Sequence, residues 1–140
     1  MEAQKVQSIT DTVARSESLR TLWTAVHESG LEDTLRGVGP FTIFAPADEA
    51  FAKLPASTLR RLLKNKKTLS SVLEYHVIPG RVSAAEAAGL VSARTVQGQP
   101  LMLAEENGRV MVDHARVLQA DIPCANGFIH VIDHVVSPKA

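Results

Sequence analysis

The chain has 140 residues, a length typical of one domain, and 45% of them are apolar, which is enough to bury a core. Its fifteen basic and fifteen acidic side chains balance at pH 7, so no overall positive field favours nucleic-acid binding. The single cysteine, Cys124, excludes an intramolecular disulfide and a zinc site rich in thiolates.

The first third of the chain carries apolar residues at helical spacing. This spacing predicts one helix over 6–13 and a second over 19–26. The second helix could be capped at its start by Ser16 or Ser18 and ended by Gly30. Helices therefore come first along the chain.

The pattern changes after a further helical turn, predicted over 31–35 and stopped by Gly37–Pro40. Phe41–Ala45 is short, aromatic and β-branched, and a proline follows it, so we predict a strand. Asp48 could then cap the next helical turn, over 49–54.

The rest of the chain predicts three more helices and then a sheet. The helices are expected over 59–63, 68–76 and 84–88, with a turn at Pro79-Gly80, and Asn107-Gly108 is typical of a two-residue hairpin. The candidate strands are Ala93–Val96, Leu101–Ala104, Arg109–Asp113, Ala115–Ala120 and Phe128–Val136. Helices before strands, without βαβ alternation, predict an α+β fold with a mainly antiparallel sheet.

Three segments of the chain resemble the characteristic segments of fasciclin domains of the beta-Ig-H3 type. Gly39–Phe51 resembles the first homology segment, Leu73–Gly80 the tyrosine–histidine segment, and Asn126–Pro138 the second homology segment. They occur in the family's order and spacing, and the resemblance covers the chain from about Ile9 to Pro138.

The resemblance implies a β-sandwich or wedge with helices packed against it, as a single domain over 1–140 with its core at about 6–138. It also implies adhesion, with protein, glycan or matrix partners, and neither catalysis nor a cofactor. It implies a secreted, periplasmic or cell-surface location. No signal peptide and no apolar run of ~18–20 residues is visible, so either a leader has been removed or the protein is cytoplasmic. The lack of disulfides and of glycosylation sites favours a prokaryotic source, and nothing indicates an oligomeric state.

Four polar residues stand out within the first two segments: Thr42, Asp48, Tyr75 and His76. If the first strand meets the end of the tyrosine–histidine helix, they would form one cluster. Buried polar groups need hydrogen-bond partners, so we expect these side chains to satisfy one another and to fix the fold, and not to bind a ligand.

Two surface features could bind a partner. One is a group of five cations within eight positions, namely Arg60, Arg61, Lys64, Lys66 and Lys67. It is either a solvated helix face or a site for an acidic polysaccharide, lipid headgroups or an acidic protein. The other is Asp121-Ile122, which resembles the aspartate–isoleucine pair of integrin-recognition motifs in animal fasciclin domains. It could instead end a strand, with Ile122 packed inside.

Metal binding and catalysis have little support in the sequence. His130 and His134 would lie about 13 Å apart on one face of a strand, too far apart for one ion, although His27, His114 or Cys124 could supplement either. We therefore predict no metal site. No nucleophile elbow, phosphate loop or zinc-protease motif occurs, and a pairing of Cys124 with His130 lacks a third, orienting group.

These observations favour a non-catalytic binding or adhesion module. A structural or accessory domain of the envelope or matrix, without a ligand of its own, is the alternative. A small-molecule or metal binder is a third possibility, which a concave apolar site with convergent polar groups would favour.

Overall fold

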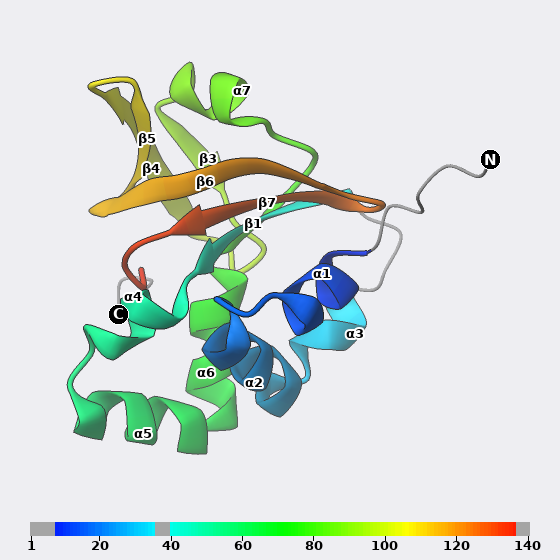
Figure 1. The fold of residues 1–140 in the computed structure, drawn as a ribbon, viewed down its shortest axis with the longest axis vertical. Helices are drawn as coiled ribbons and strands as arrows, with labels where there is room; N and C mark the ends of the chain where they lie inside the picture. The colour runs from blue at the N-terminus through cyan, green and yellow to red at the C-terminus, as the bar shows by residue number, and fades with distance from the viewer. Residues whose placement is uncertain (1–7, 36–39, 137–140) are drawn as a thin grey trace.

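Six helices gather on one side of a sheet, and a seventh lies on the other side, beside β4 and β5 (Figure 1). The computed structural model describes residues 8–35 and 40–136; the expected positions Val6, Gly37–Gly39 and Ser137-Pro138 lie outside them. The helices are α1 (Ile9–Arg15), α2 (Arg20–Ser29), α3 (Leu31–Leu35), α4 (Asp48–Ala52), α5 (Ala56–Lys64), α6 (Lys66–Glu74) and α7 (Ala84–Ala88). The strands are β1 (Phe41–Pro46), β2 (Val77–Pro79), β3 (Ser92–Arg94), β4 (Pro100–Glu106), β5 (Arg109–Val112), β6 (Ala115–Cys124) and β7 (Gly127–Ile132).

The sheet is mixed but mostly antiparallel, with strand order β2-β1-β7-β6-β5-β4-β3. Only β1 and β7 run parallel, from the pair Phe41 and Gly127 onwards, and the other neighbours are antiparallel. The two edges approach each other, because the Val96 amide donates a hydrogen bond of 2.8 Å to the Val77 carbonyl. The predicted α+β class is confirmed, with a sheet that nearly closes.

Both faces of the central strands β1 and β7 are buried, which explains their nearly continuous apolar sequences. Successive side chains of a strand point to opposite faces. Ile43 and Ile129 accordingly pack against the helices α1 to α6, whereas Phe44 and Ile132 pack in a second core with the residues of β4 and β5. The β1–β7 pair therefore joins two hydrophobic cores.

The turn expected at Pro79-Gly80 is preceded by a strand that was not predicted. Val77–Pro79 forms β2, an edge strand, and pairs with β1. Three residues are too few for a period-two pattern to be visible, and a proline fits there because an edge strand does not need every amide.

The two strands at the end of the chain differ in length from the prediction. The expected Ala115–Ala120 continues to Cys124, because register shifts within β6 take up extra residues and the chain passes through Asp121 at φ 59°. The expected Phe128–Val136 starts one residue earlier and ends at Ile132. After that point Asp133 bonds the Arg116 amide through its carboxylate, and the regular ladder stops.

Candidate functional site

Thr42 fixes the chain where it leaves β2. Its buried hydroxyl donates a hydrogen bond of 2.8 Å to the Gly80 carbonyl and accepts one of 2.8 Å from the Val82 amide. Both donor and acceptor capacity of this hydroxyl are therefore used by backbone groups about forty residues away in sequence.

Asp48 caps a helix far from it in sequence. Its carboxylate accepts a hydrogen bond of 2.7 Å from the Thr21 amide in the first turn of α2, and its own amide donates to the Ser18 carbonyl. The expected cap of the turn over 49–54 is wrong, since α4 begins at Asp48 itself. The expected serine caps of α2 are also wrong, because its N-cap position is Leu19, which makes no side-chain bond. The Asp48 carboxylate also lies at the N-terminus of α2, where it is favoured by the positive end of the helix dipole.

Tyr75 ties the end of α6 to the β4–β5 hairpin. Its hydroxyl donates a bond of 2.7 Å to one oxygen of Asp113, and the other oxygen of that carboxylate accepts from the Met102 amide at 2.9 Å. Burial, followed by the bond to Asp113, raises the pKa of Tyr75. The hydroxyl therefore stays protonated as a donor, and a reactive phenolate is disfavoured.

His76 is fully buried and links α6 to the segment after β7. Its Nδ1 donates a bond of 2.8 Å to the Val72 carbonyl, and its Nε2 accepts one of 3.2 Å from the Val136 amide. These two partners require a neutral ring with its proton on Nδ1. Burial lowers the pKa of His76 to about 4, so the ring remains neutral at ordinary pH.

The four residues Thr42, Asp48, Tyr75 and His76 do not satisfy one another as expected. No hydrogen bond between described residues joins two of them. Each one instead bonds to backbone groups or a carboxylate of another segment. They therefore make separate hydrogen bonds that connect elements distant in sequence. Their side chains do not converge on a common site.

Asp121 lies within β6 and not in a loop. Its carboxylate accepts a bond of 2.9 Å from the Ala84 amide in the first turn of α7, and its amide donates to Nδ1 of His130 at 3.0 Å. The side chain remains 49% exposed. Ile122 is partly buried against the core under the helices, as the alternative interpretation of this pair expects.

His130 is buried between two aromatic rings and uses both nitrogens. Its Nε2 donates to the Val82 carbonyl at 2.8 Å, and its ring lies 5.4 Å from Phe44 and 6.0 Å from Phe128. His134 instead follows the end of β7, with Nδ1 bonded to Asp133 at 2.8 Å. Within residues 8–35 and 40–136, no group of three or more His, Cys, Asp or Glu side chains is arranged to hold a metal ion.

Cys124 is buried at the end of β6, where its sulfur lies 3.6 Å from the Thr12 hydroxyl. Burial raises the pKa of this thiol. A reactive cysteine needs a thiolate that is accessible to solvent. Cys124 is buried, and its raised pKa favours the protonated thiol. Its position instead suits a small apolar side chain between α1 and the sheet.

The Asn126-Gly127 turn connects β6 to β7 and also contacts α1, α3 and β1. The Asn126 side chain accepts from the Ile9 amide at 3.0 Å and donates to the Leu35 carbonyl, so it joins the start of α1 to the end of α3. At Gly127, a Cβ atom would lie 1.6 Å from the Phe41 carbonyl oxygen, because β1 passes directly beside it. The dipeptide signals a turn, but nothing local in the sequence indicates these distant contacts.

Arg81 is a further contact residue that the sequence does not single out. Its guanidinium lies 5.1 Å from the centre of the Phe128 ring and within 3.4 Å of the carbonyls of Cys124, Ala125 and Gly127. The guanidinium therefore stacks on the Phe128 ring and also contacts the backbone of the β6–β7 hairpin. No spacing pattern in the sequence points to this role.

The five predicted cations share one exposed hairpin of helices. Arg60, Arg61 and Lys64 lie on α5, and Lys66 and Lys67 lie at the start of α6. None of them takes part in an ion pair within the described part of the chain. The link between the helices is short, and the Asn65 side chain caps α6 by accepting from the Thr68 amide at 3.2 Å. We call this unit, residues 56–74, the cationic hairpin.

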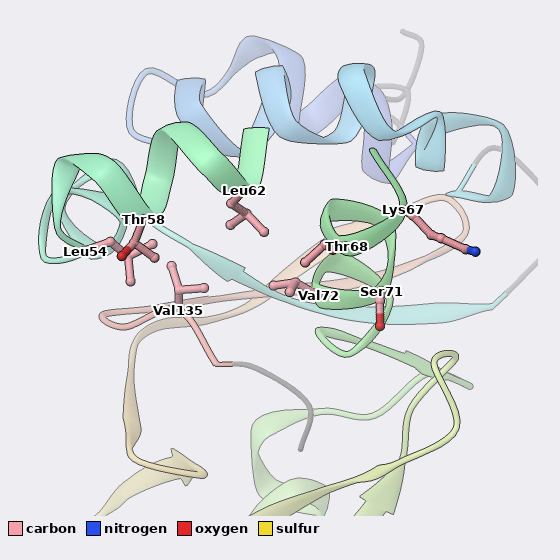
Figure 2. Close-up of a pocket in the computed structure, with 8 residues that line it drawn as sticks. All are labelled: Leu54, Thr58, Leu62, Lys67, Thr68, Ser71, Val72 and Val135. Carbon is pink, nitrogen blue, oxygen red and sulfur yellow. The ribbon is translucent and has the colours of Figure 1, made fainter. Parts of the chain in front are cut away.

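A groove runs along the inner side of the cationic hairpin (Figure 2). Its volume is about 480 Å³, and its lining residues are Leu54, Thr58, Leu62, Lys67, Thr68, Ser71, Val72 and Val135. A second space of about 180 Å³ adds Arg61 and Asn65 and shares Thr58, Leu62 and Thr68 with the first. Local sequence patterns do not predict this groove, because Val135 comes from the far end of the chain.

Comparisons with known proteins agree with this geometry. A family model described as the fasciclin domain matches residues 17–138. Protein sll1483 of Synechocystis is 42% identical over 134 residues, which are 94% of this chain and 73% of that protein. The cell surface glycolipoprotein MPB83 of Mycobacterium bovis is 40% identical over 110 residues, 79% of this chain and 49% of that protein.

The fold is also similar to a solved structure. A FAS1 domain pair from the insect cell adhesion molecule fasciclin I has a TM-score of 0.84 and 21% sequence identity, over 96% of this chain and 52% of that chain. In the described residues, no helix is both long and apolar enough to span a membrane. The chain belongs to the fasciclin domain family, whose members are adhesion and extracellular binding modules that are generally non-catalytic.

Proposed function

We propose that this domain is a non-catalytic binding module at the cell surface or in the matrix, and that it recognises an acidic glycan or an acidic protein through the cationic hairpin. The main observation that supports this proposal is the exposure of five cations on two adjoining helices. None of them is in an ion pair within the described residues. Such a surface attracts anionic partners over a distance set by ionic strength.

The distribution of charge supports the proposal. The chain as a whole has a formal net charge of zero, but the stretch 56–67 contains five basic residues and no acidic one, and so carries a local charge of +5. A balanced protein with one concentrated positive face presents a defined site to an acidic partner. The named relatives fit the proposed location, since one is called a cell surface glycolipoprotein and another a cell adhesion molecule.

The pair Asp121-Ile122 is the second candidate site, because half of the Asp121 side chain is exposed. Its carboxylate already holds the Ala84 amide at the start of α7, and Ile122 packs against the core. A partner would have to compete with these contacts, so the cationic hairpin is the better candidate.

The proposal predicts salt-sensitive binding to a sulfated polysaccharide such as heparin, measured by titration calorimetry. We expect the affinity to fall at least about tenfold as NaCl rises from about 50 mM to about 500 mM, since salt screens exposed charges. The double variant Arg60→Glu/Lys64→Glu is expected to weaken binding at low salt by about tenfold or more.

The matched control is Arg94→Glu/Arg109→Glu, which makes the same change of charge at exposed positions on β3 and β5. It is expected to bind almost as well as the unmodified domain, and so is Asp121→Asn. Equal weakening by both charge variants would mean that only overall charge matters, and this result would contradict the proposed site.

A further inference from the structure

The groove beneath the cationic hairpin is lined on its apolar side by aliphatic residues. Leu54 and Leu62 lie on one wall, Val72 of α6 on the other, and Val135 closes the space from the segment after β7 (Figure 2). Its volume of about 480 Å³ lies within the ~300–1,000 Å³ typical of sites for small molecules. No aromatic ring is among the described residues that line it, and these residues therefore offer no flat surface for a stacking ligand.

Helix α5 turns Leu62, which is only partly buried, towards this groove. None of its residues is fully buried, although Leu59, Leu62 and Leu63 all face inward and pack partly against the core. A helix with a clear apolar face normally buries that face against a neighbour. An aliphatic chain lying in the groove would complete the burial and remove apolar surface from water.

Polar groups gather around the same groove. The hydroxyls of Thr58 and Thr68 make no side-chain hydrogen bond to another described residue, and the Ser71 hydroxyl has only a long contact of 3.5 Å with the Gln97 amide. Lys67 also lines the groove, its ammonium extends outward at one end of it (Figure 2), and it has no ion pair in the described part of the chain. An anionic headgroup would find a cation and hydroxyl donors here, while a cationic one would meet five like charges.

We propose that the groove binds a single-chain aliphatic carboxylate, a fatty-acid-type amphiphile, with its chain along Leu54, Leu62, Val72 and Val135 and its carboxylate at Lys67. The charge of the rim and the aliphatic lining together select this class over neutral or cationic amphiphiles. A peptide helix is about 10 Å across with side chains, so one turn would already fill this space, and a single chain fits it better. This inference goes beyond the proposed function and does not depend on it, since Lys67 alone of the five cations lines the groove and the other four remain available to a polysaccharide.

The test is a titration of the domain with dodecanoate, below its micelle-forming concentration and up to roughly 1 mM. We expect saturable changes in the backbone amide signals of residues that line the groove, and none with dodecyltrimethylammonium. Lys67→Gln is expected to weaken dodecanoate binding by about tenfold, because one charge-assisted contact is lost. Thr58→Trp, an exposed position on α5, is expected to abolish binding by filling the groove.

The matched control is Thr24→Trp, an exposed threonine on α2 outside the groove, which is expected to leave dodecanoate binding unchanged. Three results would overturn the inference: no amide changes with dodecanoate, equal binding by the cationic amphiphile, or unchanged binding by a folded Thr58→Trp variant. Loss of heparin binding in Thr58→Trp would also overturn it, since the groove would then belong to the polysaccharide site. Loss of heparin binding in Arg60→Glu/Lys64→Glu with dodecanoate binding retained would separate the two proposals.

Discussion

Gly127→Ala is expected to lower the free energy of unfolding by about 4 kcal/mol or more, and so to leave much of the protein unfolded. The added Cβ atom would lie 1.6 Å from the Phe41 carbonyl oxygen and 2.7 Å from its carbonyl carbon. Both are backbone atoms of the neighbouring strand, so the clash cannot be relieved by rotating a side chain. The parallel pair β1–β7 would have to separate at its first residues, and this pair joins the two cores.

Urea unfolding followed by circular dichroism measures this effect. The matched control is Gly89→Ala, where the added atom would make only an ordinary contact of 3.6 Å with the Glu86 carbonyl oxygen and the backbone is already right-handed. The control is expected to unfold within about 1 kcal/mol of the original protein. A Gly127→Ala midpoint equal to that of Gly89→Ala would show that the two strands are not this close.

His76 is expected to make the domain less stable as the pH falls from about 7 to about 4.5, by about 2 to 3 kcal/mol. Burial lowers its pKa from 6.5 to about 4, so the unfolded chain takes up a proton in a range where the folded protein does not. Stability from this residue is therefore fully present above pH 6.5 and is lost as the pH falls towards 4. Protonation would also remove the acceptor that Nε2 offers to the Val136 amide.

The measurement is the free energy of unfolding at both pH values for the original protein and for His76→Asn. The variant is expected to be less stable at neutral pH, because the buried Val136 amide loses its partner, but to depend much less on pH. His114→Asn, at an exposed histidine that makes no ion pair with another described residue, is the control and is expected to keep the original pH dependence. If His76→Asn retains the full loss of stability at about pH 4.5, another group is responsible.

Local patterns in the sequence were sufficient to predict the class of the fold. Helical spacing of apolar residues locates α2 and α6, and the β-branched run locates β1, because each pattern lies within one element. The parallel pairing of β1 with β7 could not be predicted in this way. Those strands lie more than eighty residues apart, and which strands pair depends on how both cores are filled.

The partners of the polar residues could not be predicted either, because they lie far away in the sequence. Residue type alone suggested that Asp48 was a helix cap, but the helix that it caps lies 27 residues earlier in the chain. Tyr75 was singled out, whereas its partner Asp113 was not, since an aspartate in a β-hairpin region has no distinctive spacing. Exposure of the five cations, by contrast, follows from the amphipathic patterns of α5 and α6, which are local properties.

The central claim is that the polar residues of the family segments hold the fold together, while partners bind at the cationic hairpin. Mapping of backbone amide signals during titration with a short heparin oligosaccharide tests it most directly. We expect the largest changes over residues 56–71, with little change over 82–86 and 119–124, where Asp121 meets α7. Changes concentrated at Asp121 and its neighbours, with the hairpin signals unmoved, would contradict the claim.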